Sequence, residues 1–213
     1  MRSVTAIVAF ILLTNMVNAQ QRVTFGAGAQ AGIAIEAFQA SIKDYYSIGY
    51  GGGGHFDVNF MPALTTRMNI EYYSFASDKD KLKQQLAPLY GVQPGDITGL
   101  SGGTIGVFIV SLNAIGRVPT GTNVSPYGLF GLGIHSISLS DLSGSAFGQT
   151  GTLTAEDLGV KTGTKFGLNF GVGVDMRVAR GVNLNLEFKY VLVFTEDETN
   201  AAMPIMVGVT FKF

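Results

Sequence analysis

The sequence contains no cysteine and no tryptophan, and only 6 of its 213 residues are proline. Without cysteine, disulfide bonds and zinc sites built on thiolates are excluded, so the fold must be held together by its own packing. The scarcity of proline excludes a disordered proline-rich chain. These absences indicate a folded chain of a length suited to one domain.

A long hydrophobic run is also missing. A membrane-spanning helix needs roughly 20 apolar residues. The most apolar stretch after the N-terminus, TIGVFIVSLNAIG at 104–116, is interrupted by Ser111 and Asn113. The sequence therefore predicts no transmembrane helix.

The N-terminus has the pattern of a secretory signal peptide. Arg2 precedes an apolar run from about Val4 to Leu13, and small residues lead up to Ala19. This pattern is typical of an exported chain cleaved after a small residue. We predict a signal peptide at 1–19, cleaved after Ala19, followed by one domain at 20–213.

Charge of one sign does not dominate the exported chain. Removing Arg2 leaves 13 of the 14 basic residues against 15 acidic ones, a net charge of −2. This balance gives no reason to expect nucleic acid as a partner.

What the sequence does contain is alternation. In NLNLEFKYVLVF (183–194) every second residue is apolar, whereas Asn183, Asn185, Glu187 and Lys189 fall between them. Successive side chains of a strand point to opposite faces, so one face of this strand is apolar and the other polar. Similar runs predict eight strands, at 23–33, 48–60, 65–76, 103–114, 125–139, 164–178, 183–194 and 203–213.

The connections between these strands fall into two classes. Those at 61–64, 115–124 and 179–182 are short or fairly short, whereas those at 34–47, 77–102 and 140–163 are long. The connection at 195–202 is intermediate in length. Short turns at one end and long loops at the other are typical of outer-membrane barrels, in which the turns face the periplasm.

The two longest loops contain helix-capping patterns. In SDKDKLKQQLAPL, Ser77 is positioned to cap a helix with Asp80, and Pro88 to close it. Thr154 and Asp157 form a second pattern of this kind. Short helical turns and irregular polar loops both remain open.

The chain resembles the small outer-membrane β-barrel proteins of Gram-negative bacteria, the class of the OmpA transmembrane domain and OmpX. The resemblance rests on the signal peptide, the stretch PYGLFGLGI, the paired strands FGLNFGVGVDMRVARGVNLNLEFKYVLVF and a last strand ending in phenylalanine. It implies an all-β fold, an eight-stranded antiparallel up-and-down transmembrane β-barrel. It also implies that Val209, Phe211 and Phe213 form the signal read by the barrel-assembly machinery.

The resemblance decides which face of the strands points inward. In an outer-membrane barrel the apolar face meets lipid and the polar face lines the lumen. We therefore predict a lumen charge network of His55, Asp57, Arg67, Glu71, Asp175, Arg177, Glu187 and Lys189. A secreted lipocalin-like barrel, with the apolar face inside, is the soluble alternative.

Catalysis and cofactor binding are not expected. Some barrels of this class act on lipopolysaccharide with serine and histidine, but Ser136 and Ser138 lie on the opposite strand face from His135, and position 137 is isoleucine. Nucleophile and base need to lie within hydrogen-bonding reach. The glycine-rich stretches GAGA and GVGV lie within strands and lack a following P-loop lysine. We predict no enzyme activity, cofactor or metal site.

The expected function is structural or interactive. We predict a protein of the bacterial outer membrane, surrounded by lipid and lipopolysaccharide, that presents the loops 77–102 and 140–163 to an extracellular ligand. An eight-stranded barrel is only wide enough for side chains to fill it, so the charges should plug the lumen. The alternative is a narrow conduit for small apolar or ionic solutes.

Overall fold

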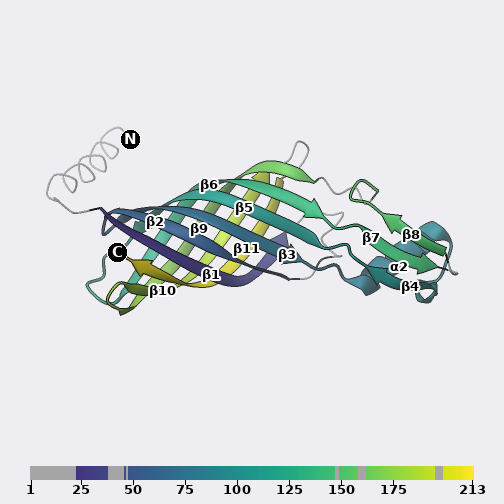
Figure 1. Cartoon of the computed structure of the whole chain (residues 1–213), viewed down its shortest axis with the longest axis horizontal. Helices are drawn as coiled ribbons and strands as arrows, with labels where there is room; N and C mark the ends of the chain where they lie inside the picture. Colours follow the sequence, from purple (N-terminus) through teal and green to yellow (C-terminus); the bar gives the residue numbers. More distant parts are fainter. Residues whose placement is uncertain (1–22, 38–45, 47, 147–148, 158–161, 195–198) are drawn as a thin grey trace, which may run out of the picture.

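The computed structural model describes residues 23–37, 46, 48–146, 149–157, 162–194 and 199–213. Eight long antiparallel strands form a closed barrel in the order β1-β11-β10-β9-β6-β5-β3-β2 (Figure 1). They are β1 (Thr24–Ala37), β2 (Gly49–Met61), β3 (Leu64–Phe75), β5 (Ile105–Arg117), β6 (Val124–Leu139), β9 (Gly163–Ala179), β10 (Val182–Phe194) and β11 (Thr199–Lys212). The predicted fold class is confirmed. The predicted signal peptide, and most of the first long loop, lie outside the described residues.

The barrel closes where its first and last strands meet. β1 pairs with β11 along its length, and Phe25 and Phe213 exchange backbone hydrogen bonds of 3.0 and 2.9 Å. Closure gives every barrel strand a hydrogen-bonded neighbour on both sides. The barrel strands have 12 to 17 residues, longer than the roughly 9–11 that cross a bilayer, so they extend beyond the hydrocarbon layer.

The two ends of the barrel differ as the sequence predicts. Two residues join β2 to β3 and two join β9 to β10, where Gly181 adopts a φ of 75°. We call this the turn end; it also holds the C-terminus (Figure 1). The opposite, loop end carries the long connections.

The apolar face of the strands points outward. On β10, Leu186 is 53% exposed, whereas Glu187 is 1% exposed. The same alternation leaves Leu112 and Val172 exposed on other strands. The lipocalin-like alternative, which requires the apolar face inside, is therefore wrong.

Aromatic side chains lie on this outward face near both ends. Phe25 packs against Phe56 and Phe213 at the turn end, with ring centroids 6.0 and 6.5 Å apart. Phe166 stacks on Phe194 at the loop end, at 6.4 Å. Two such bands flank the lipid-facing zone of outer-membrane barrels. No helix among the described residues is long and apolar enough to cross a membrane.

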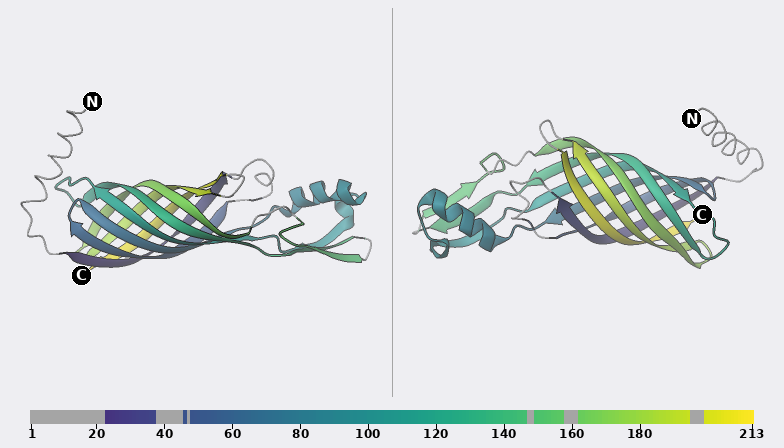
Figure 2. Two further views of the ribbon diagram at one scale, coloured as in Figure 1. Left: turned by 90° about the horizontal axis from the view of Figure 1, so that it is seen from above. Right: turned by 180° about the vertical axis from the view of Figure 1, so that it is seen from behind.

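The second and third long loops fold together beyond the loop end of the barrel (Figures 1 and 2). They contribute α2 (Lys79–Tyr90), η2 (Pro94–Asp96), β4 (Ile97–Ser101), β7 (Leu142–Ala146) and β8 (Gln149–Leu153), which we call the loop module. Its sheet has the order β4-β7-β8. The three short strands were not predicted.

The loop module continues the β5–β6 hairpin of the barrel. Gly103 donates to the carbonyl oxygen of Ser140 at 3.1 Å, and Ser140 donates to Thr104 at 3.0 Å. These bonds bridge the gap between barrel strands and the β4–β7 pair. The module is thus tied to the barrel through backbone pairing and not only through flexible connections.

A helix forms in the first of these loops, but with different ends from those predicted. Asp78, not Ser77, caps it by accepting from the backbone N–H groups of Asp80 and Lys81. Pro88 lies inside the helix, which ends before Gly91 in the left-handed conformation. Glycine adopts this conformation with little strain, so Gly91 ends the helix instead of the predicted Pro88.

The second capping pattern forms a hydrogen-bonded turn without becoming a helix. The backbone N–H and hydroxyl of Thr154 both donate to Asp157 at 2.8 Å. These bonds lower the pKa of the Asp157 carboxyl.

Candidate functional site

Two regions of the molecule are candidate sites: the barrel interior, which contains buried charges, and the loop module, which contains a pocket. The turn-end half of the interior holds a network of buried charges. Arg67 lies at its centre, 1% exposed. Its guanidinium donates to both carboxylate oxygens of Asp57, at 2.7 and 3.0 Å, and to Glu187 at 3.2 Å.

A second arginine extends this network. Arg117 donates to Asp175 at 2.7 Å and to the Thr65 hydroxyl, and lies 3.9 Å from Asp57. Arg117 was missed because the predicted strand ended at 114. The inward alternation of Ser111, Asn113 and Ile115 continues to it and was the available signal.

Lys189 closes the network on the loop side. It pairs with Glu71 and lies 3.7 Å from Glu187. Glu71 also accepts from Gln30, and Glu187 accepts from the Tyr127 hydroxyl at 2.8 Å. Buried ions need this combination of opposite charge and hydrogen bonding.

Two predicted network residues behave differently from the rest. His55 lies inside the barrel and hydrogen-bonds to Thr210 at 2.8 Å, without an ion pair to a described carboxylate. Arg177 is exposed at the turn end and donates to Asn123 at 2.9 Å. The prediction for Arg177 is wrong. Alternation shows on which side of the strand a residue lies, but not whether that part of the strand is within the enclosed barrel.

Glycines leave room for these side chains. An added Cβ at Gly173 would lie 2.3 Å from the Tyr127 ring, and one at Gly28 would lie 2.5 Å from the His55 ring. The strand glycines thus allow large side chains to fill a narrow barrel.

The loop-end half of the interior is apolar, which the sequence did not predict. Its buried residues include Tyr73, Phe75, Ile105, Val107, Ile109, Ile137, Val191, Val193 and Met206. A cavity of about 30 Å³ lies among them, large enough for about one water molecule. This cluster explains why both faces of β5 are apolar from Ile105 to Val110.

His135 lies where the polar and apolar halves meet. It is fully buried, and neither ring nitrogen hydrogen-bonds to a described residue. Its neighbours Ser136 and Ser138 point to the other face of β6, as expected from the alternation.

Near His135, the backbone pairing of the barrel wall is interrupted between β10 and β11. Pairing between β10 and β11 is continuous from Val182 to Phe188 and again from Val191, but Lys189 and Tyr190 have no partners in that ladder. Pro204 lies opposite the gap and has no backbone N–H to donate.

The residues predicted as an assembly signal lie on the last strand. Phe211 and Phe213 are 52% and 70% exposed on the lipid-facing side, and Val209 is half-buried. Their predicted recognition by the assembly machinery stays a prediction.

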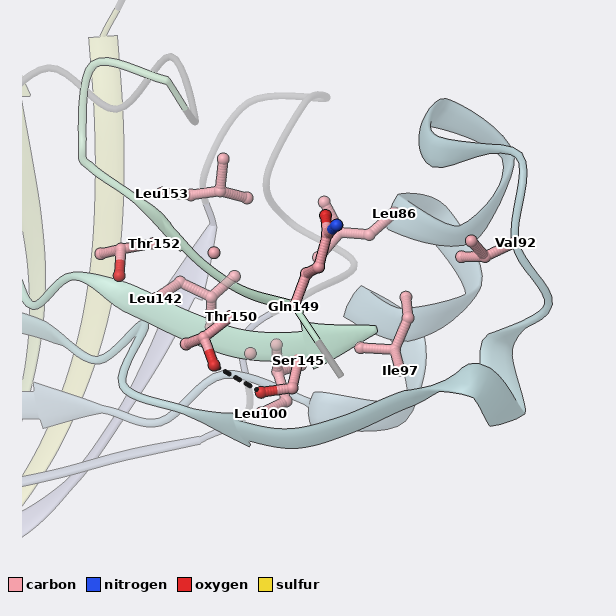
Figure 3. A pocket seen from close by; sticks show the side chains of 12 residues that line it. Leu86, Val92, Ile97, Leu100, Leu142, Ser145, Gln149, Thr150, Thr152 and Leu153 are labelled. Atoms are coloured by element: carbon pink, nitrogen blue, oxygen red, sulfur yellow. Dashed lines mark hydrogen bonds between the residues drawn. The ribbon is translucent and has the colours of Figure 1, made fainter. Parts of the chain in front are cut away.

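The loop module has its own hydrophobic cluster. Leu82, Leu86 and Ala87 of α2 pack against Ile97 and Leu142 of the small sheet. Beside this cluster lies a pocket of about 470 Å³ (Figure 3). Among the described residues, no group of three or more His, Asp or Glu side chains is arranged to hold a metal ion.

The comparisons identify what this chain is similar to. The sequence matches the family described as outer membrane protein beta-barrel domain over residues 5–213. No curated protein matches it.

Solved structures share the fold at low sequence identity. Neisserial surface protein A (NspA) superposes with a TM-score of 0.56 at 15% identity, covering 91% of this chain and 100% of that one. A major outer membrane protein from Thermus thermophilus gives 0.55 at 12% identity, covering 91% and 100%. OprG from Pseudomonas aeruginosa gives 0.52 at 12%, covering 92% and 99%.

Proposed function

This chain belongs to the outer membrane protein beta-barrel domain family, and from that premise we propose that its barrel is an anchor for the loop module. The barrel lies in the bacterial outer membrane with its turn end toward the periplasm. The module then stands outside the cell. Its role is to present a binding surface to extracellular ligands.

The single observation that carries this proposal is the fold of the two long loops. Leu82 and Leu86 come from one loop and Leu142 from the other, yet they share one buried cluster. Loops that only connect strands have no need for a core of their own. Loops that carry function are commonly held in place by a rigid scaffold, here the extended β5–β6 hairpin.

The interior supports an anchoring role rather than transport. Three cations and four carboxylates fill the turn-end half, all nine-tenths or more buried. We propose that they plug the lumen, since a barrel of this strand number has room only for its own side chains. We propose no catalytic role, because the serines nearest to His135 lie on the opposite face of β6.

Partners of the barrel follow from its surface. The outward apolar band, with Leu186 and Leu112 near its middle, contacts outer-membrane lipid and lipopolysaccharide. The strand that carries Val209, Phe211 and Phe213 is recognised by the barrel-assembly machinery. The signal peptide is removed after Ala19 during export.

One observation favours the alternative role of a narrow conduit. The apolar loop-end half of the interior adjoins the gap in the β10–β11 ladder at Pro204. Apolar solutes would meet no buried charge in this half. They would still meet the charge network below it.

Ion conductance separates anchoring from the passage of ionic solutes through the barrel. The wild-type protein in a planar bilayer should give no stepwise current, and neither should a variant with short Gly-Asn turns replacing 77–103 and 140–162. Arg67→Ala, which opens the network, serves as the positive control. Stepwise current through the wild type that persists without the loop module would overturn the anchoring proposal.

A further inference from the structure

The pocket in the loop module lies between α2 and one face of the β7–β8 hairpin (Figure 3). Its volume of about 470 Å³ is within the roughly 300–1,000 Å³ typical of small-molecule sites. Its walls are six aliphatic side chains: Leu86, Val92, Ile97, Leu100, Leu142 and Leu153.

Two glycines form the floor of the pocket. Gly144 on β7 pairs directly with Gly151 on β8, and the same face carries Leu142 opposite Leu153. An added Cβ at Gly151 would meet no heavy atom within 4 Å. An added Cβ at Gly144 would lie 2.9 Å from the Leu100 side chain, so this position has no room for one. Glycine weakens a strand and often marks a site where a ligand approaches the backbone closely.

Among the described residues, no charged side chain lines the pocket. The hydroxyl groups of Ser145 and Thr150 hydrogen-bond to each other at 3.1 Å and belong to the opposite face of the hairpin. The Gln149 side chain shares the face of Gly151 and provides a polar group beside Leu86 (Figure 3). Thr152 also lines the pocket. The pocket therefore offers aliphatic walls with uncharged polar groups, of which the Gln149 amide lies beside Leu86.

We propose that this pocket binds a neutral aliphatic molecule with one hydroxyl or carbonyl group. The hydrocarbon chain lies across Gly144 and Gly151, and the polar group hydrogen-bonds to the Gln149 amide. An ionised ligand would bring a charge next to the leucines without a counter-charge, which is unfavourable. This inference rests on the proposed function, since it names the ligand class of the module that the barrel presents.

The test uses the full exported chain in lipid nanodiscs, because detergent would compete for an apolar pocket. Methyl NMR signals are followed while 1-octanol or octanoate is added at neutral pH. Octanol should shift the methyl signals of Leu86, Ile97 and Leu153 saturably, and octanoate should bind at least tenfold more weakly. The lipid-facing Leu186 reports octanol that only partitions into the bilayer.

Filling the pocket supplies the matched variants. Gly151→Leu should abolish the saturable shifts. Gly116→Leu, at a barrel position where an added Cβ also meets nothing within 4 Å, should leave them unchanged. Gly151→Ala adds one methyl group and should weaken octanol binding severalfold, which keeps the test decisive if the leucine variant disturbs the module.

Three results would overturn the inference: no saturable shift with octanol, equal binding of octanoate, or unchanged binding in both Gly151 variants. None of them bears on conductance, so a failed ligand assignment is distinguishable from a failed anchoring role. Conversely, stepwise current through the wild type that persists without the loop module would refute the anchor even if octanol binds.

Discussion

Replacing Arg67 by methionine should test the buried charge network most directly. The substitution keeps an unbranched chain about as long as the aliphatic part of arginine but removes two hydrogen bonds to Asp57 and one to Glu187. Removing one partner of a buried ion pair costs roughly 3–5 kcal/mol, because the other charge stays buried. Asp57 keeps Arg117 at 3.9 Å, and Glu187 keeps the Tyr127 hydroxyl at 2.8 Å.

This residual compensation places the expected loss at the lower end, about 3 kcal/mol, or roughly a hundredfold in the folding equilibrium. The assay is urea unfolding in lipid vesicles under reversible conditions. Arg177→Met is the matched control, since this arginine is exposed and should change stability by less than about 0.5 kcal/mol. Adding Asp57→Asn to Arg67→Met should recover part of the loss. A cost below about 1 kcal/mol for Arg67→Met, or equal costs for the two arginines, would refute the reasoning.

Other variants examine the lipid face, topology, assembly and helix cap. Leu186→Arg should destabilise the barrel in lipid by roughly 2–4 kcal/mol, measured by the same unfolding assay, because the side chain faces the bilayer. A cysteine replacing exposed Lys81 should react with a membrane-impermeant thiol reagent on intact cells, and one replacing Leu186 should not; protection of both would contradict the proposed topology. Deleting Phe213 should reduce outer-membrane insertion while export continues, as measured by fractionation. Asp78→Ala should destabilise α2 by about 1 kcal/mol through loss of its cap, detectable as faster hydrogen exchange in the helix.

The barrel was predictable because the sequence of each strand shows which of its faces is apolar. In β10 the alternation of Leu184, Leu186 and Phe188 with Asn185 and Glu187 needs no tertiary information, and its pairing with β9 follows from a two-residue turn. All eight predicted strands are present, although β11 begins four residues earlier than expected, at Thr199.

The sequence predicts which residues face the barrel interior, but not how far along the barrel axis that interior extends. Alternation alone cannot tell whether a residue lies inside the barrel or beyond its rim, which is why Arg177 was included. Arg117 was left out because the predicted strand ended at residue 114. The prediction of a polar inward face also does not anticipate that Val107 and Ile109 point inward. They contact other inward apolar residues only once the strands have closed into a barrel.

The loop module was not predictable from local pattern. The strand segments ITGLS, LSGSA and QTGTL have little alternation and few β-branched apolar residues. They become a sheet because α2 covers them and because the β5–β6 hairpin positions their ends. Such tertiary stabilisation overrides weak strand propensity.

The shared cluster of the loop module constrains how this protein can vary among strains. Surface loops usually accept insertions and deletions independently. Here Leu82 and Leu86 depend on Leu142, which lies more than fifty positions further along the sequence. A deletion in either loop would leave the apolar residues of the other uncovered. Changes of length in the two loops should therefore be inherited together, and chimaeras that exchange only one of them should present a disordered surface.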